Sequence, residues 1–158
     1  MQVVHLALQE LSKMNKKDAY YMSLAKLAGE QSKDPHTKVG SCVVKNGKVL
    51  TLGWNGAPRK IDDSLVPYSC KDRTKPLKEQ KYSWIIHSEI NSILNYGGSL
   101  GDFEGASIYV TVSPCCDCAK ALIQAGISEV VYLSEYKDFP MSKYLFDLSG
   151  VKYRKLGE

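Results

Sequence analysis

The sequence predicts an α/β protein: a three-layer α/β/α sandwich around a mixed five-stranded sheet. Strand-like runs alternate with helix-like runs over most of the chain, which is the pattern of parallel β-α-β units. The first two strand-like runs are instead joined by Asn46-Gly47, a strong signal for an antiparallel hairpin. A length of 158 residues suits one hydrophobic core, so we expect a single domain over residues 1–158.

Each element has its own local signal. Apolar groups at helical spacing predict a first helix over 18–31, with Asp18 available to cap it. Residues 56–83 contain three prolines and many charges, which predicts a long loop or lid of the kind that is often functional. The hairpin strands are expected at 39–45 and 48–54, later helices at 87–96, 115–126 and 140–150, and later strands at 106–113, 129–134 and 151–156.

Charge and hydropathy exclude some classes of protein. The net charge is +4, and the lysines are spread along the chain, whereas a dedicated nucleic-acid binder usually carries a concentrated basic stripe. The densest basic run, residues 71–81, is either a solvated loop or an attraction for a phosphorylated substrate. No apolar run approaches the roughly 20 residues of a membrane span, and no secretory signal begins the chain. We expect a cytoplasmic protein that binds neither membrane nor nucleic acid.

Cysteine and histidine placement indicates a metal site. Three of the five cysteines fall within residues 115–118, unlike the spread, even-numbered cysteines of a disulfide framework. The sequence His87-Ser88-Glu89, followed later by Pro114-Cys115-Cys116-Asp117-Cys118, matches the H-x-E and P-C-x-x-C signature of zinc deaminases.

The signature residues suit one catalytic zinc per subunit. His87, Cys115 and Cys118 supply three nitrogen and sulfur ligands, and a catalytic site leaves the fourth position for water. The two cysteines, three residues apart, share one face of a helix, which leaves Cys116 off the metal. Glu89 is then free to move protons. The alternative is a structural or redox role, but a structural site needs a fourth protein ligand that the pattern does not supply.

Further stretches are similar to those of the deoxycytidylate (dCMP) deaminase family, of the cytidine deaminase-like superfamily. The resemblance runs from about residue 20 to 136, and its motifs are SKDP (32–35), TKVG (37–40), GWNGAPR (53–59), HSEIN (87–91), VSPC (112–115) and CAK (118–120). Serines at positions 88 and 92 replace the family's usual alanines. The resemblance implies zinc on His87, Cys115 and Cys118, with Glu89 as the proton shuttle. No second, structural zinc is expected.

The resemblance also implies contacts to nucleotides. Expected substrate contacts are Asn55, Asn91, Ser113, Tyr136 and Arg59. For three of them a structural alternative stands beside that role: turn chemistry for Asn55, packing at a strand end for Tyr136, and a surface ion pair with Asp62 or Asp63 for Arg59. Gly53, Asn55, Gly56 and Arg59 are candidates for an effector site that binds dCTP or dTTP, with Mg²⁺ as a possible companion.

The implied reaction is the zinc-dependent deamination of dCMP to dUMP and ammonia, which supplies dUMP for thymidylate synthesis. Rival substrates are a 5-substituted dCMP, a cytosine nucleoside and a transfer RNA base. A rival from another class is a non-catalytic protein that keeps zinc for structure. The family also implies a homo-oligomer, possibly a hexamer, regulated by nucleotides. Against regulation, Gly97-Gly98 stands where some regulated relatives place an arginine.

Overall fold

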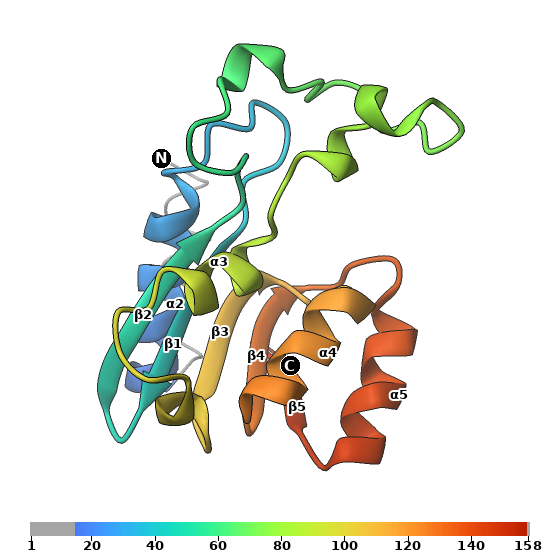
Figure 1. Cartoon of the computed structure of the whole chain (residues 1–158). Coiled ribbons are helices and arrows are strands. Elements are labelled where there is room, and N and C mark those ends of the chain that lie inside the picture. The colour runs from blue at the N-terminus through green and yellow to red at the C-terminus, as the bar shows by residue number, and fades with distance from the viewer. Residues whose placement is uncertain (1–14, 158) are drawn as a thin grey trace, which may run out of the picture.

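The computed structural model describes residues 15–157 and is built on one five-stranded mixed sheet (Figure 1). The strand order is β2-β1-β3-β4-β5. The pairings β2–β1 and β1–β3 are antiparallel, and β3–β4 and β4–β5 are parallel. The strands are β1 (Gly40–Lys45), β2 (Lys48–Trp54), β3 (Ser107–Val112), β4 (Glu129–Ser134) and β5 (Lys152–Lys155). The predicted sheet is therefore confirmed. Residues 1–14 and 158 lie outside the described part.

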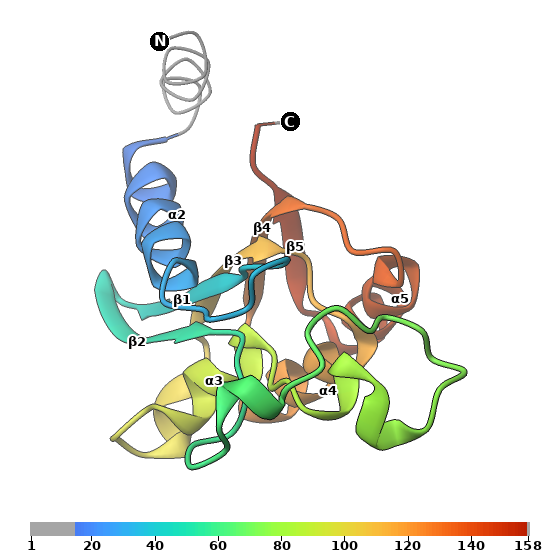
Figure 2. The same cartoon turned by 90° about the horizontal axis from the view of Figure 1, so that it is seen from above.

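Helices cover both faces of the sheet, which confirms the three-layer prediction (Figure 2). On one face, Met22 and Ala25 of α2 pack with Cys42, Tyr109 and Val131 of the sheet. On the other face, a larger core joins the sheet to the later helices and includes the fully buried Phe103, Leu122, Phe139 and Phe146. The helices are α2 (Lys16–Gly29), α3 (Ser88–Leu94), α4 (Cys116–Ala125) and α5 (Phe139–Ser149).

The hairpin turn has the geometry that its sequence predicts. Asn46 and Gly47 have φ angles of 52° and 73°, the left-handed values that a two-residue hairpin turn requires and that asparagine and glycine tolerate best. Because β1 is the strand next to β3, this hairpin forms the antiparallel edge of an otherwise parallel sheet.

The start of α2 corrects the predicted cap. The side chain of Asn15, not Asp18, accepts the first free backbone N–H groups, and the helix begins at Lys16. Asp18 is buried and accepts hydrogen bonds from the Tyr109 hydroxyl and the Arg154 guanidinium, at 2.6–2.8 Å. The carboxylate that was predicted to cap the helix is thus bound by Arg154, which lies 136 residues away in the sequence.

The helix predicted over 87–96 is shorter, since α3 begins after His87 and ends at Leu94. Residues 56–83, which we call the lid, rise from one end of the sheet (Figure 1). The lid holds three short 3₁₀ turns, η1 (Asp63–Leu65), η2 (Leu77–Glu79) and η3 (Lys81–Ser83), and no longer element. An isolated antiparallel bridge between Gly56 and Ile86 closes its base. Within residues 15–157, no helix has the length and apolar character that a membrane crossing needs.

Candidate functional site

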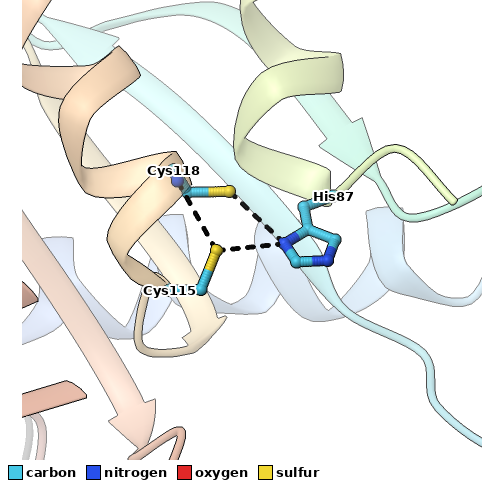
Figure 3. A group of neighbouring side chains, drawn as sticks. All are labelled: His87, Cys115 and Cys118. Carbon is cyan, nitrogen blue, oxygen red and sulfur yellow. Dashed lines mark hydrogen bonds between the residues drawn. The ribbon is translucent and has the colours of Figure 1, made fainter. Parts of the chain in front are cut away.

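Two helix N-termini bring the predicted metal ligands together. His87 is the residue before α3, Cys115 is the residue before α4, and Cys118 lies in the first turn of α4. His87 Nδ1 lies 3.4 Å from Cys115 Sγ and 3.4 Å from Cys118 Sγ (Figure 3). All three ligand atoms lie within 4.8 Å of one another. Nitrogen and sulfur ligands of one tetrahedral zinc stand about 3.6 Å apart, so this donor set fits zinc in both chemistry and spacing.

Hydrogen bonds among the three side chains shift their pKa values in different directions. Hydrogen bonds with Cys118 and His87 lower the pKa of the Cys115 thiol. The hydrogen bond with Cys115 raises the pKa of His87, although burial of the imidazole acts in the opposite direction. The Cys115 contact and burial both raise the pKa of Cys118. Zinc binding replaces such protons with metal, because thiolate and neutral imidazole are the forms that ligate.

Glu89 lies beside this group, in the first turn of α3, and is only 3% exposed. Burial raises the pKa of its carboxyl group, because an apolar environment disfavours the carboxylate. The hydroxyl of Ser88 donates to Glu89 Oε2 at 3.1 Å, and the hydroxyl of Ser92 donates to the Glu89 carbonyl at 2.8 Å. Both serines are fully buried, so the two departures from the family pattern are accommodated by hydrogen bonds.

Close packing against β2 fixes α3. A side chain at Gly53 would place its Cβ 2.2 Å from the Ser88 carbonyl oxygen and 2.6 Å from the Ser92 nitrogen. The hydroxyl of Ser41 donates to the same carbonyl at 2.9 Å, and Asn91 Nδ2 donates to the Trp54 carbonyl at 2.7 Å. The sheet therefore sets the position of the helix that carries Glu89 and follows His87.

A cavity of about 220 Å³ opens beside the cysteine and histidine group. Its lining includes the sequence-predicted residues Asn55, His87, Glu89, Ser113, Cys115 and Tyr136. Ser113 is buried, and its hydroxyl accepts a 2.7 Å hydrogen bond from the Tyr136 N–H, which ties these two residues together. Cys118 is only 1% exposed and is not part of the lining.

The side-chain amide of Asn55 makes most of its hydrogen bonds within the protein. Its Oδ1 accepts from the Val39 N–H at 2.8 Å, and its Nδ2 donates to the Thr37 carbonyl at 2.8 Å and to Asp34 at 3.5 Å. Asn55 therefore holds the loop before β1 as well as lining the cavity. An amide oxygen has two lone pairs, so Oδ1 retains capacity for one more donor.

The other predicted nucleotide contacts lie elsewhere. Asn91 lies outside the cavity lining, and Gly53 lies beneath α3. Arg59 and Gly56 line a second cavity of about 240 Å³, which they share with Asn55, Lys33 and Lys60 among others.

Sequence reasoning did not assign several lining residues: Thr37, Val39, Lys71, Lys81, Tyr82, Ile85 and Val112. The basic run 71–81 was the available signal for the two lysines, with phosphate attraction as one of its two interpretations. Nothing local in the sequence indicates that Lys81 is buried.

Comparison with known proteins gives a consistent family. Residues 15–134 match the family described as "Cytidine and deoxycytidylate deaminase zinc-binding region". The deoxycytidylate deaminase of Homo sapiens is 39% identical over 142 residues, which cover 86% of this chain and 77% of the human protein. The deoxycytidylate deaminase of enterobacteria phage T2 is 33% identical over 147 residues, covering 73% of this chain and 78% of the phage protein.

A solved structure agrees with these relatives. The crystal structure of dCMP deaminase from the cyanophage S-TIM5 in complex with dCMP and dUMP has a TM-score of 0.71 and 29% sequence identity. The match covers 90% of this chain and 98% of the cyanophage chain.

Proposed function

The chain belongs to the cytidine and deoxycytidylate deaminase family, and we propose that its reaction is the hydrolysis of dCMP to dUMP and ammonia. One observation carries the proposal: a buried carboxylate, Glu89, lies in the cavity beside a His/Cys/Cys group with zinc-like spacing. The identity to curated deoxycytidylate deaminases supports dCMP as the substrate. Production of dUMP, the substrate for thymidylate synthesis, is the corresponding metabolic role.

His87, Cys115 and Cys118 would hold the zinc, one ion per subunit. Zinc in such a site is a Lewis acid that lowers the pKa of a water molecule from 15.7 toward about 7. The three protein ligands leave the fourth tetrahedral position for solvent or substrate.

Glu89 moves the protons in the proposed reaction. Water supplies the oxygen that bonds to C4 of cytosine, and the bond from C4 to the amino nitrogen breaks. One water proton passes through Glu89 to N3 of the ring, and the other passes through Glu89 to the departing amine, which leaves as ammonia. The buried position of Glu89 keeps bulk water from competing for these protons.

The remaining contacts divide into two kinds. We assign Ser113 and Tyr136, which line the cavity, to direct contact with the substrate, and Asn55 to contact through the second lone pair of Oδ1. Asn91 instead positions α3 through its hydrogen bond to the Trp54 carbonyl.

Ammonia release from a substrate panel tests the proposal. The panel is dCMP, CMP, dCTP, deoxycytidine, 5-methyl-dCMP and a transfer RNA anticodon stem-loop. We expect dCMP to give the highest kcat/KM, and a higher value for 5-methyl-dCMP, a nucleoside or the stem-loop would assign the rival substrate. No ammonia from any cytosine compound, in protein with full zinc content, would favour the structural zinc role.

We further propose that the protein is a cytoplasmic homo-oligomer, with a hexamer as the assembly to test, and that dCTP and dTTP regulate it at the second cavity. The basic side chains of Arg59 and Lys60 at that cavity suit a triphosphate, with Mg²⁺ as a companion of the nucleotide. Lys33 of the same lining is already paired with Asp63, at 2.8 Å. Gly56 and Asn55 are also part of its lining.

Sedimentation gives the oligomeric state, and dCMP saturation curves with and without dCTP and magnesium test regulation. A curve that dCTP shifts in the wild type but not in Arg59→Ala, with zinc retained, supports the effector site. A hyperbolic curve that neither dCTP nor dTTP moves would contradict it.

A further inference from the structure

Two lysines of the lid line the catalytic cavity. Lys71 is exposed to solvent, whereas Lys81 is only 5% exposed and lies within the protein. The other charged or metal-ligating side chains of the lining, those of His87, Glu89 and Cys115, belong to the proposed reaction centre. The lid therefore supplies two ammonium groups to the lining of a cavity whose reactive groups lie at the N-terminal ends of α3 and α4.

A buried ion pair fixes Lys81. Its Nζ pairs with the carboxylate of Asp34, which is fully buried. Burial alone would raise the pKa of Asp34, but hydrogen bonds from Lys81 and from the backbone N–H groups of His36 and Thr37 outweigh it and lower that pKa. Since a buried charge without its partner is strongly unfavourable, this pair anchors the lid to the loop before β1.

The anchor extends to Cys70, the residue before Lys71. The backbone N–H of Lys81 donates to the Cys70 carbonyl at 2.9 Å, so the two ends of the segment 70–81 are held together beside the cavity. Inside that segment, Gln80 Nε2 donates to the carbonyls of Arg73 and Lys75. The segment is thus closed by its own hydrogen bonds, which limits the freedom that Lys71 would otherwise have as a loop residue.

An aromatic residue of the lid also lines the cavity. Tyr82, which follows Lys81, lines the cavity, and the Arg73 guanidinium lies 4.4 Å from the centre of its ring. Tyr136 lines the same cavity as Tyr82, and burial is the chief cause that raises the pKa of its hydroxyl group.

We propose that Lys71 binds the 5′-phosphate of the nucleotide and that the Asp34–Lys81 ion pair positions it. This inference rests on the proposed function, because it takes C4 of cytosine to lie at Glu89. The phosphate is then at the opposite end of the nucleotide from C4, and Lys71 is the solvent-exposed cation of the cavity lining. Arg59 lines the second cavity and not this one, so we assign the phosphate contact to Lys71 rather than to Arg59.

The binding chemistry makes Lys71 a specificity residue. A phosphate monoester carries close to two negative charges at neutral pH, and a lysine ammonium binds it as a point charge. Deoxycytidine lacks that group, so the lysine contributes only to the nucleotide. A contact made through the phosphate lowers KM for dCMP with little change in kcat.

The test compares dCMP with deoxycytidine in the zinc-loaded protein. We expect Lys71→Gln to lower kcat/KM for dCMP by roughly 10- to 100-fold, the range for a hydrogen bond to a charged group, and to leave deoxycytidine unchanged. Lys71→Arg, which keeps the positive charge, should retain most of the wild-type kcat/KM for dCMP. Lys78→Gln, an exposed lysine of the same lid outside the cavity lining, is the matched control and should change neither substrate.

Several results would overturn the assignment. An equal loss on both substrates, an equal loss in Lys78→Gln, or no loss in Lys71→Gln would each do so. A loss specific to dCMP in Arg59→Gln or Arg73→Gln, with Lys71→Gln silent, would transfer the role to that arginine. Wild-type protein inactive on both compounds would refute the proposed function itself, which is a separate outcome.

A double-mutant cycle tests the positioning role of Lys81. If Lys81 acts through Lys71, Lys81→Met raises KM for dCMP. The double variant should then lower the ratio of kcat/KM for dCMP to kcat/KM for deoxycytidine by less than the sum of the two single effects on a free-energy scale. Additive effects, or an equal loss on deoxycytidine, would contradict positioning. Should Lys81→Met fail to fold, Lys81→Arg provides the cycle, because it keeps the charge and alters its reach to Asp34.

Discussion

Gly53→Ala is a single-methyl change that we expect to damage the site through α3. Gly53 lies in β2 directly beneath the first turn of that helix, and its new Cβ would stand 2.2 Å from the Ser88 carbonyl oxygen. Ordinary contacts of this kind begin at 3.4 Å, so the backbone at Ser88 would have to retreat by about 1.2 Å, the difference between these distances. The obstacle is helix backbone, which cannot rotate away as a side chain would.

The expected magnitudes follow from that displacement. Overpacking of this kind costs about 1–3 kcal/mol, and the lower freedom of the unfolded alanine chain offsets at most about 1 kcal/mol of it. The hydrogen bond from Ser41 to the Ser88 carbonyl would also be strained. A 1 Å misplacement of reacting groups can cost about 100-fold in rate. We therefore expect the activation free energy of the reaction to change by more than the free energy of unfolding.

Urea denaturation and dCMP turnover measure the two effects in the same preparation. Gly97→Ala is the matched control, because no atom lies within 4 Å of the methyl group it would add and its backbone is not in the left-handed region. We expect a lower urea midpoint and reduced kcat for Gly53→Ala, and near wild-type values for Gly97→Ala. Wild-type stability and turnover in Gly53→Ala, or the same loss in both variants, would refute the reasoning.

Further predictions concern the metal, the proton carrier and pH. Metal analysis should find one zinc per subunit, and the double variant Cys115→Ser/Cys118→Ser should lose it; full zinc in that variant would exclude these ligands. Glu89→Gln should keep zinc and fold but lower kcat at least 100-fold, and turnover above a tenth of wild type would contradict the proton role. The hydrogen bonds from Arg154 hold the pKa of Asp18 in the folded protein below its usual value. This pair therefore stabilises the fold at pH values above about 3.9, the pKa of aspartate in the unfolded chain. The stabilisation is lost as the pH falls through the lower pKa that Asp18 has in the folded protein. Arg154→Met should therefore lower the free energy of unfolding at pH 7, with a gap to wild type that narrows below about pH 4; a gap independent of pH would exclude this cause.

Elements whose signals are local could be predicted from the sequence. Asn46-Gly47 predicted the hairpin because the turn needs left-handed backbone at both positions, whatever the rest of the chain does. Gly126 likewise ends α4 with a φ of 90°, as the predicted boundary requires. His87, Cys115 and Cys118 were predictable as a group, because the chemistry of zinc restricts both residue type and spacing.

Features that depend on distant partners could not be predicted. Asp18 was available to cap a helix by its position, but Tyr109 and Arg154 bind its carboxylate from two separate strands. Lys81 belongs to a basic run typical of a solvated loop, and only its pairing with Asp34 across the fold explains its burial. Local composition describes what such residues can do, and the tertiary partner decides which of these they do.

The position of the cations around the cavity follows from how the lid leaves and rejoins the sheet. The bridge between Gly56 and Ile86 closes the base of the lid, so residues just after Gly56 run beside the second cavity. Arg59 lies at the second cavity, although it belongs to the GWNGAPR motif (53–59), whose resemblance to the family implied a contact with the nucleotide. Lys71 lies far from any such motif, yet the hydrogen bond between Lys81 and Cys70 turns the returning chain over the catalytic cavity. Selection for the phosphate therefore resides in the geometry of the lid, and a change in how the lid is anchored should alter the preference for nucleotide over nucleoside without altering the zinc ligands.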